Sequence, residues 1–418
     1  MIILQWKIKI PKTVRNTHLT PHTKRNKELK MQTPTPATYM RGGTSKGIFF
    51  NLADLPKPCQ VAGQARDAFL LRVVGSPDPY GKQIDGMGNG SSSTSKVVIL
   101  SPCTDGTHDV NYLFGQVAID KAMIDWSGNC GNLTGAVGAF AITNGLVQAD
   151  KIPDNGICTV KIYQQNIGKT IIAHIPIKDG QVQETGDFEL DGVTFPASEV
   201  KIEFIDPVDD DGEMFPTGNL KDRLSVPDVG EFDVTFINAG IPTIFLRASD
   251  LGFTGTELQK DINSNGEILA KLEKIRAYGA VQMGLISHID EAQTRQHTPK
   301  IAWVAPPADY VSSSGKTVKA DDIHLLVRAM SMGQLHHAMM GTASVAIGTA
   351  GTIVGTLVND VAGGQELNEV CFGHPSGTLT VGGQSECVNG KWLARKVSMS
   401  RSARRLMVGQ VFVPEDSF

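Results

Sequence analysis

The stretch SGNCGNLTGAVGAFAITNG, residues 127–145, places one cysteine directly before a run of small and apolar residues. This composition predicts a helix that starts after Cys130 and packs closely against its surroundings. The first N–H groups of a helix have no partner within it and lie at the positive end of the helix dipole, where a thiolate is stabilised. We therefore expect Cys130 to be a reactive or proton-exchanging thiol. The alternative is a small buried cysteine that only fills space.

A second stretch, MGTASVAIGTA at residues 340–350, resembles the first one. When Cys130 is aligned with Met340, glycines and alanines fall at the same places, and the two stretches lie about half the chain apart. This repeat predicts two similar lobes with one glycine-rich helix each. The alternative is that two closely packed helices need small residues independently. Glycine at a helix start lets an anion approach the backbone, so two such starts could hold several carboxylates between them.

Length, charge and cysteine content exclude several classes of protein. The 418 residues are enough for two domains of ordinary size, and the net charge of −4 gives no basic field for nucleic acid. No apolar run reaches the roughly 18–20 residues that a membrane span needs. The 6 cysteines are scattered without a CxxC pair, which is typical of a reduced, cytoplasmic protein.

The first 30 residues differ from the rest, since they hold eight Lys or Arg and one Glu and lack the apolar segment of a secretory signal. We expect residues 1–33 to be a disordered or spurious extension, and a nucleic-acid-binding arm is the alternative. The N-terminal lobe is predicted to span residues 34–205 and to be completed by the C-terminal segment, about 395–418. The C-terminal lobe is predicted to span residues 206–394.

Short β-type runs alternate with helical segments along the chain, which predicts a mixed α+β fold rich in strands. Besides the two small-residue helices, helical periodicity is present at residues 65–75 and 257–279. The strands are expected at residues 47–51, 96–100, 111–119, 158–164, 169–177, 232–240, 243–248, 301–305, 323–330, 377–383 and 409–414.

Motifs spread from Ala37 to Pro414 resemble those of one family. They are MRGGTSKGIFF (40–50), GSPDPYGKQIDGMGNGSSSTSK (75–96), DWSGNCGNLTGAVGAFA (125–141), INAGIPTIF (237–245), SMGQLHHAMMGTASVAIGTA (331–350), GHPSGT (373–378) and SRSARRLM (400–407). Together they resemble the PrpF family of 2-methylaconitate cis–trans isomerases, within the diaminopimelate epimerase-like superfamily. The resemblance implies an α+β fold of two pseudo-symmetric lobes, each a mixed sheet wrapped around a central helix. It also implies an active site in the cleft between the lobes, at the two helix starts.

The resemblance also indicates catalytic residues. Epimerases of this fold use two cysteines, one at each helix start. The first resembles Cys130, but the second falls at Met340, whose thioether carries no proton, and this departure argues against amino-acid racemisation. PrpF-like members pair the remaining cysteine with a lysine, and Lys96 matches that position. Lys96 could bind a carboxylate, donate a proton or, with a lowered pKa, act as a base.

Polar residues and glycines near the helix starts and in two loops are expected to contact the substrate. Serine and threonine hydroxyls can donate hydrogen bonds to a carboxylate, and the turn at residues 44–45 matches the family's first substrate-binding turn. The expected substrate-binding residues are Thr44, Ser45, Ser93, Thr94, Asn129, Gly131, Asn132, Gly341 and Thr342. Asn238 and Gly240 fit either a substrate-side turn or a structural turn.

No cofactor and no metal are expected. The sequence GGTSKG at residues 42–47 lacks the P-loop spacing. His336 and His337 are not expected to bind a metal, because adjacent histidines do not share a face. His374 is expected to be structural. The arginines of SRSARRLM, which are Arg401, Arg404 and Arg405, are expected to pack between lobes or lie on the surface, with charge neutralisation of a tricarboxylate as the alternative.

These features predict a cofactor-free isomerase of unsaturated tricarboxylates. The resemblance implies cis–trans isomerisation of 2-methylaconitate, in the 2-methylcitrate route of propionate breakdown, by removal and return of a proton. Double-bond migration in methylitaconate and tautomerisation of 4-oxalomesaconate are the related alternatives. The expected partners are the tricarboxylate, a second copy in a homodimer and, by function, an aconitase-like 2-methylcitrate dehydratase. A non-enzymatic alternative is an accessory protein for such a hydratase.

Overall fold

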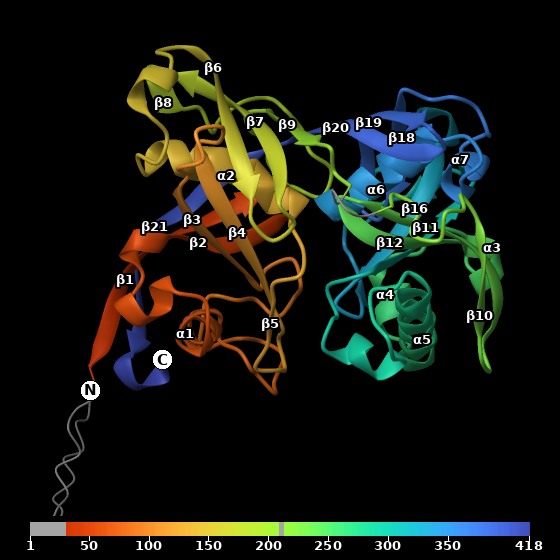
Figure 1. Cartoon of the computed structure of the whole chain (residues 1–418), viewed down its shortest axis with the longest axis horizontal. Coiled ribbons are helices and arrows are strands. Elements are labelled where there is room, and N and C mark those ends of the chain that lie inside the picture. Colours follow the sequence, from red (N-terminus) through yellow and green to blue (C-terminus); the bar gives the residue numbers. More distant parts are fainter. Residues whose placement is uncertain (1–30, 209–212) are drawn as a thin grey trace, which may run out of the picture.

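The computed structural model describes residues 31–208 and 213–418, which form two lobes side by side (Figure 1). The expected N-terminal extension lies almost wholly outside these residues. Strand β1 (Gln32–Gly42) begins before the predicted entry at Pro34, because Gln32 and Thr33 already pair with the last strand, β21 (Ala403–Pro414). The two ends of the described chain therefore lie together at the first lobe (Figure 1).

The first lobe is a sheet wrapped around α2 (Gly131–Thr143), with α1 (Gln64–Val74) on its outer face. Neighbouring strands follow the order β21, β1, β2, β3, β4, β6, β7, β9 and β20, and the β2–β3 and β4–β6 pairs are parallel. The further strands are β2 (Ser45–Asn51), β3 (Lys96–Pro102), β4 (Val110–Val117), β5 (Ile124–Asp125), β6 (Gly156–Gln164), β7 (Lys169–Lys178), β8 (Gln181–Val182), β9 (Val200–Ile205) and β20 (Lys391–Arg401).

The second lobe repeats this arrangement around α6 (Gly341–Thr352), with α4 (Gln259–Asn263) and α5 (Gly266–Gln282) outside. Its strands follow the order β20, β19, β18, β16, β13, β12, β11 and β10, and the β16–β18 and β12–β13 pairs are parallel. The remaining elements are β10 (Asp222–Val226), β11 (Gly230–Ala239), β12 (Ile241–Arg247), α3 (Ala248–Leu251), β13 (Lys300–Ala305), β14 (Tyr310–Val311), β15 (Thr317–Val318), β16 (Leu325–Ser331), β17 (Gln334–Leu335), α7 (Leu357–Val361), β18 (Glu369–His374) and β19 (Gly377–Val388).

The matching strand order confirms the predicted pseudo-symmetric α+β fold. The run β1–β2–β3–β4–β6–β7 in the first lobe corresponds to β11–β12–β13–β16–β18–β19 in the second, with parallel pairs at the same steps. Strand β20 pairs with β9 on one side and with β19 on the other, so one sheet runs through both lobes. Figure 1 shows β20 between them.

The period-two alternation of strand residues decides which side chains meet the central helices. In β3, Val98 and Leu100 belong to the core around α2, while Val97 and Ile99 pack toward α1. In β13, Ala302 and Val304 belong to the core around α6, while Ile301 and Trp303 pack toward α5. The inner faces of both sheets thus share one core with the two glycine-rich helices.

The two central helices begin against each other. A Cβ atom on Gly131 would lie 2.6 Å from the carbonyl carbon of Gly341, and a Cβ on Gly341 would lie 2.4 Å from that of Gly131. Any side chain at either position would therefore collide with backbone. This contact explains why both helices start with glycine, and it brings the two helix N-termini to one point between the lobes.

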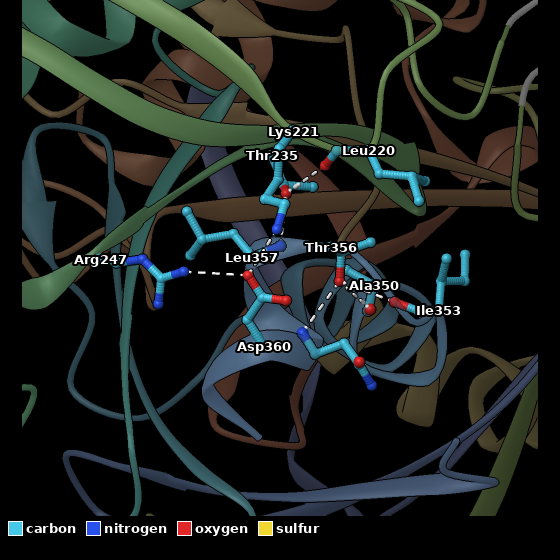
Figure 2. A network of polar contacts seen from close by, with 10 residues as sticks. Leu220, Lys221, Thr235, Arg247, Ala350, Ile353, Thr356, Leu357 and Asp360 are labelled. Carbon is cyan, nitrogen blue, oxygen red and sulfur yellow. Dashed lines mark hydrogen bonds and ion pairs between the residues drawn. The ribbon is translucent and has the colours of Figure 1, made fainter. Parts of the chain in front are cut away.

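Helix α7 holds the far end of α6 through a polar network (Figure 2). The Oγ1 of Thr356 accepts a hydrogen bond from Asn359 N at 3.1 Å and donates to Ala350 O at 2.6 Å. The Oγ1 of Thr235, on β11, accepts from Leu357 N at 2.9 Å. These contacts tie α6 and α7 to the sheet and so fix the axis along which α6 points at the first lobe.

The structure contains most of the predicted elements, and it adds several long strands. Of the strands with five or more residues, the sequence did not predict β1, β9, β10, β18 and β20, because charged and polar residues or prolines interrupt their apolar pattern. No helix within residues 31–208 and 213–418 is both long and apolar enough to cross a bilayer.

Candidate active site

The starts of α2 and α6 present two sets of backbone N–H groups to each other. Thr134 N donates the first intrahelical bond of α2, to Cys130 O at 3.0 Å, and Ser344 N does the same to Met340 O at 2.9 Å. The N–H groups of residues 131–133 and 341–343 consequently have no acceptor within their own helices. Gly131, Gly341 and Thr342 lie where the two sets meet, as the sequence predicts for an anion-binding centre.

Lys96 is buried at the first position of β3, on the face that meets α2. Its Nζ donates a hydrogen bond to Oε1 of Gln116 on the neighbouring strand and lies 5.2 Å from the centroid of the Phe114 ring. Burial lowers the pKa of Lys96 below the usual lysine value, and the charge of the nearby Cys130 opposes part of that change. The predicted lysine and cysteine are therefore close enough for their charges to interact.

Cys130 is the residue before the first turn of α2, and its side chain is buried. Its backbone N–H donates to Oδ1 of Asn129 at 2.6 Å, and its carbonyl accepts from Thr134 Oγ1 at 3.0 Å. The Nδ2 of Asn129 is buried without a hydrogen-bond partner among the described residues. An unpaired amide donor beside the thiol is available to a ligand that enters this point.

Asn132 links three parts of the site. Its Nδ2 donates to Thr44 Oγ1 at 3.0 Å and to Met339 O at 3.0 Å, and its Oδ1 accepts from Nε of Arg401 at 3.1 Å. Arg401 is buried and therefore not on the surface, and burial lowers its pKa to about 10. The predicted contact residues Thr44 and Asn132 thus position each other next to a buried guanidinium.

Ser93, in the serine-rich loop of the first lobe, contacts two histidines of the second lobe. Its Oγ is 3.1 Å from Nε2 of His336 and 3.3 Å from Nδ1 of His337. The two imidazole rings stack with their centroids 4.7 Å apart. The expectation that these histidines do not share a face is wrong, because they lie in a bend between β17 and α6, where neighbouring side chains can run parallel.

A cleft of about 520 Å³ opens beside these residues. The predicted contact residues Thr44, Ser45, Ser93 and Thr94 line it together with His337. Three cationic side chains and one carboxylate, Glu184, also line it, and Glu184 is paired with Arg405. The segment 192–197, which includes an exposed phenylalanine, forms another part of the wall. The three cations are Arg41, Lys46 and Arg404. The cleft therefore offers hydroxyl donors and positive charge, which suits an anionic ligand.

His297 and Lys300 reach the same centre, although the sequence analysis did not single them out. The Nζ of Lys300 is 3.2 Å from Nδ1 of His297, whose Nε2 is 3.4 Å from the carbonyl oxygen of Asn129. Burial, followed by the charges of Lys300 and Lys96, lowers the pKa of His297 well below its usual value. One signal was present in the sequence, since Lys300 stands directly before a buried β-type run, as Lys96 does.

Three further residues that the sequence analysis named, Gly240, His374 and Asn238, make contacts within the fold. Gly240 has φ +71°, and a Cβ there would lie 2.6 Å from Val345 on α6, so this turn packs against the helix. His374 is buried, and its Nδ1 accepts from Ser376 N at 3.2 Å, as expected for a structural histidine. Asn238 N donates to Met214 O at 2.8 Å, within the same turn region.

One group of possible metal ligands lies away from the cleft. Ligand atoms of Cys103, Asp105 and His108 lie within 4.8 Å of one another. They follow the end of β3 that is opposite to Lys96, and the two ring nitrogens of His108 already contact Asp105 and Thr170. This group has no contact with the helix starts, so the prediction of a metal-free active site does not depend on it.

Comparisons of sequence identify the family to which the chain belongs. A family model described as PrpF protein matches residues 32–414. Relatives named 2-methyl-aconitate isomerase, from Shewanella oneidensis and Cupriavidus necator, are 69% and 64% identical to this chain, each over 93% of this chain and 99% of the relative. A 3-methylitaconate isomerase from Eubacterium barkeri is 40% identical over 90% of this chain and 97% of its own length.

Solved structures share the fold. The crystal structure of a methylitaconate-delta-isomerase has a TM-score of 0.71 and 38% identity, covering 92% of this chain and 97% of that chain. A probable proline racemase from Agrobacterium radiobacter has a TM-score of 0.51 and 11% identity, covering 91% and 93%. At that identity the likeness shows the fold alone, and it is the diaminopimelate epimerase-like fold expected from the sequence.

Proposed function

The chain belongs to the PrpF family, and we propose that it is a cofactor-independent isomerase that interconverts the cis and trans forms of 2-methylaconitate. The observation that carries this proposal is the meeting of two helix starts beside the buried Lys96 and Cys130. The two relatives with 69% and 64% identity are named for this substrate. The proposed substrate is therefore an unsaturated tricarboxylate.

Proton transfer explains how such an isomerase works without a cofactor. A carbon–carbon double bond prevents rotation, so the bond order has to fall for a moment. Removing a proton from the saturated carbon between a carboxylate and the alkene gives an extended dienolate, in which rotation is possible. Returning a proton to that carbon fixes the other isomer. Lys96 and Cys130 are the proposed acid–base groups, and such groups typically contribute roughly 10²–10⁴-fold to the rate.

The helix starts supply the charge stabilisation that this dienolate requires. Negative charge grows on the carboxylate next to the deprotonated carbon. The N–H groups of residues 131–133 and 341–343, which lack intrahelical acceptors, are fixed donors for that carboxylate. Because they are held by two packed helices, they need no rearrangement when the charge develops.

The cleft residues support a substrate with three carboxylates. Arg41, Lys46 and Arg404 line the cleft together with the hydroxyls of Thr44 and Ser93. Thr44 contacts Asn132 in the first turn of α2, and Ser93 contacts His336 in the loop before α6. One carboxylate is proposed to bind at the helix starts and the others at the cations. Neutralisation of a tricarboxylate by Arg404, which the sequence analysis gave as the alternative to a packing or surface role, belongs to this proposal.

Incubating the purified protein alone with trans-2-methylaconitate tests the proposal. Proton NMR should show the cis isomer at catalytic rates without any hydratase, metal or nucleotide, and the Cys130→Ser protein provides the matched control. No conversion by a folded wild-type protein would contradict the proposal. It would favour the accessory alternative, in which the protein acts on an aconitase-like 2-methylcitrate dehydratase. If the protein is an isomerase, its proposed link to that dehydratase is a shared substrate.

Methylitaconate isomerisation is the second candidate function, because a relative with that name is 40% identical. The same proton chemistry moves the double bond of this dicarboxylate, and 4-oxalomesaconate tautomerisation uses it as well. Comparing kcat/KM for the three substrates distinguishes them. If the cations bind the additional carboxylate, Arg404→Gln should lower kcat/KM for 2-methylaconitate more than for methylitaconate.

The proposed location is the cytoplasm, and the proposed assembly is a homodimer. All six cysteines are free, and Cys130 has to remain a thiol to exchange a proton. Reduced thiols persist in the cytoplasm. Sedimentation of the purified protein measures the oligomeric state directly.

A further inference from the structure

Two loops that precede a strand contact the opposite lobe, and they do so at matching positions. Ser93, three residues before β3, contacts His336 in the loop that precedes α6. His297, three residues before β13, contacts Asn129 in the loop that precedes α2. The first contact lies at the cleft, whereas the second lies at the residue directly before Cys130.

The ring of His297 is buried against the first lobe. Its centroid lies 5.7 Å from that of the Phe114 ring on β4, which Nζ of Lys96 also contacts. A Cβ on Gly128 would lie 2.6 Å from Cδ2 of the imidazole, so a side chain at that position would collide with the ring. The imidazole of the second lobe is therefore packed next to both acid–base groups of the first lobe, the lysine and the loop that carries the thiol.

The contacts of His297 fix which ring nitrogen carries the hydrogen. Its Nε2 is 3.4 Å from the carbonyl oxygen of Asn129, which can only accept a hydrogen bond, so Nε2 is the donor. Its Nδ1 is then an acceptor and takes a hydrogen bond from Nζ of Lys300 at 3.2 Å. Burial, followed by the charges of Lys300, Lys96 and Arg295, lowers the pKa of the ring well below its usual value. The ring is consequently neutral, as one donor and one acceptor require.

Neighbouring residues strengthen the contact between these two segments. Oδ2 of Asp125, the last residue of β5, accepts the backbone N–H of His297 at 3.0 Å. Oδ1 of Asp125 accepts from N and Oγ of Ser127 at 2.8 and 2.6 Å. The Oγ of Ser127 also lies 3.1 Å from Oγ1 of Thr298. The loop before α2 is therefore held by the second lobe at several points, and its position depends on that lobe.

Cys130 lies between two peptide carbonyls that are fixed from opposite lobes. Its own carbonyl oxygen accepts hydrogen bonds from Thr134 Oγ1 at 3.0 Å and Tyr112 Oη at 3.4 Å, both in the first lobe. The preceding carbonyl, of Asn129, accepts from His297. Oδ1 of Asn129 accepts from Cys130 N, and its buried Nδ2 has no hydrogen-bond partner among the described residues. The orientation of this free donor and of the thiol therefore depends on His297.

We propose that His297 is a positioning residue for the isomerase reaction: its Nε2–H holds the Asn129 peptide and thereby orients the Asn129 amide and the Cys130 thiol toward the substrate. Lys300 supports this role by donating to Nδ1, which keeps the hydrogen on Nε2. The assignment rests on the proposed isomerase function and deepens it. It makes the second lobe responsible for the geometry of groups that the first lobe carries.

Substitutions that keep or remove the Nε2–H test the assignment. His297→Gln offers a donor to Asn129 O and an acceptor to Lys300, so its kcat should stay close to that of the wild type. His297→Leu offers neither, and its kcat should fall roughly 10–10²-fold, because a misplacement of about 1 Å at a reacting group can cost up to that much. Circular dichroism checks the fold of each variant.

His324→Leu is the matched control for the loss of a histidine that holds a backbone group. Nδ1 of His324 accepts the backbone N–H of Cys371 at 2.9 Å. His324 directly precedes β16, at the end of the β13–β16 pair that is opposite to Lys300. Its replacement removes a comparable hydrogen bond within the second lobe, and kcat should stay at the wild-type value.

Gly128→Ala displaces the imidazole without removing it. The added Cβ would meet the ring at 2.6 Å, so kcat should fall as it does in His297→Leu. Tricarballylate, a saturated tricarboxylate, should bind to both variants nearly as tightly as to the wild type, since the helix starts and the cleft cations remain. A lower kcat with binding retained indicates lost proton-transfer geometry, which a general loss of structure would not produce.

Nitrogen NMR of protein labelled at histidine adds a readout that needs no turnover. The signals of His297 are those that His297→Gln lacks. At pH 6 they should show a neutral ring with its hydrogen on Nε2, although an ordinary histidine, with a pKa of about 6.5, is mostly charged there. The couplings to the two ring protons distinguish Nε2 from Nδ1.

An imidazolium or a hydrogen on Nδ1 of His297 would overturn the proposal. A His297→Leu protein that isomerises at the wild-type rate would overturn it as well, and so would equal losses of kcat in His297→Gln and His297→Leu. A wild type that has the expected tautomer but isomerises no substrate would instead contradict the proposed function, so the two failures are distinguishable.

Discussion

Lys96 and Cys130 differ in chemistry, but both act on one proton, so their substitutions should not add. We expect Lys96→Ala and Cys130→Ser each to lower turnover by at least about 10²-fold, with circular dichroism unchanged. The double variant should be little worse than the weaker single variant, because groups that act in one step are strongly non-additive. Steady-state kinetics with 2-methylaconitate measures this.

Cys103→Ser provides the control for the thiol. Cys103 directly follows the end of β3 that is opposite to Lys96. Because a strand rises about 3.3 Å per residue, that end lies about 20 Å from Lys96. Its replacement should leave turnover nearly unchanged. Near-wild-type turnover in Cys130→Ser would mean that Cys130 only fills space at the start of α2.

Buried histidines make stability depend on pH. Burial, followed by the charge of Arg328, lowers the pKa of His374 to about 3. The unfolded chain therefore binds a proton near pH 6.5 that the folded chain does not, so the stability contributed by the neutral ring is present above this pH and is lost as pH falls from about 6.5 to about 3. One such group changes the free energy of unfolding by up to about 1.4 kcal/mol per pH unit.

Urea unfolding at pH 7 and pH 5 measures this slope. His374→Asn keeps an acceptor for Ser376 N but removes the titration, so its free energy of unfolding should fall less than that of the wild type between the two pH values. An equal fall in both proteins would show that His374 is protonated in the folded state at pH 5.

At the scale of elements, the contact between α2 and α6 predicts an unusual response to alanine. Alanine normally favours helices over glycine by about 1 kcal/mol. At Gly131 or Gly341 the added Cβ would collide with backbone at 2.6 Å or less, so Gly131→Ala should lower stability by roughly 1–3 kcal/mol and also reduce activity. Gly266→Ala is the matched control, because Gly266 is the first residue of α5 and its Cβ would meet no atom within 4 Å.

Urea unfolding of the three proteins compares the two helix starts directly. Gly266→Ala should be neutral or more stable. If Gly131→Ala were as stable as Gly266→Ala, the helix starts would not be in backbone contact, and the convergence of N–H donors would lose its basis.

The sequence predicted the elements whose pattern is local. The glycines around Cys130 and Met340 indicated both central helices, because small residues at a close contact leave a direct trace in the sequence. Strand β20 was not predicted, since Lys391–Arg401 is stabilised by pairing with β9 and β19, which are distant in sequence. Long-range pairing overrides local propensity in such strands.

The residues of the candidate active site that the sequence analysis named are those that lie in recognisable motifs. Lys96, Cys130 and the contact residues near them come from recognisable motifs. His297 and Lys300 reach the site only because the loop before β13 contacts the first lobe. Their sequence, QHTPK, has no signature of its own. The signal that could have found Lys300 is the internal repeat extended from the helices to the strands, which places a lysine before a buried run in each half.

At the scale of the whole molecule, the candidate active site belongs to neither lobe alone. One core joins the inner faces of both sheets, and β20 pairs with strands of both lobes. The serine-rich loop of the first lobe and the loop before β13 each contact the opposite lobe. A ligand at the centre therefore touches both lobes at once, and its binding should restrain them together.

Hydrogen exchange can detect whether one ligand binds to both helix starts. If a tricarboxylate binds between the helix starts, tricarballylate should slow amide exchange at residues 131–133 and at residues 341–343 by a similar factor, since both sets of N–H groups donate to it. The starts of α1 and α5 lie on the outer faces and should exchange as before. Mass spectrometry of peptides that cover these four segments makes the comparison in one experiment. Protection of α2 alone would mean that the second lobe closes the cleft without binding the substrate, and the paired-helix basis of the site would have to be abandoned.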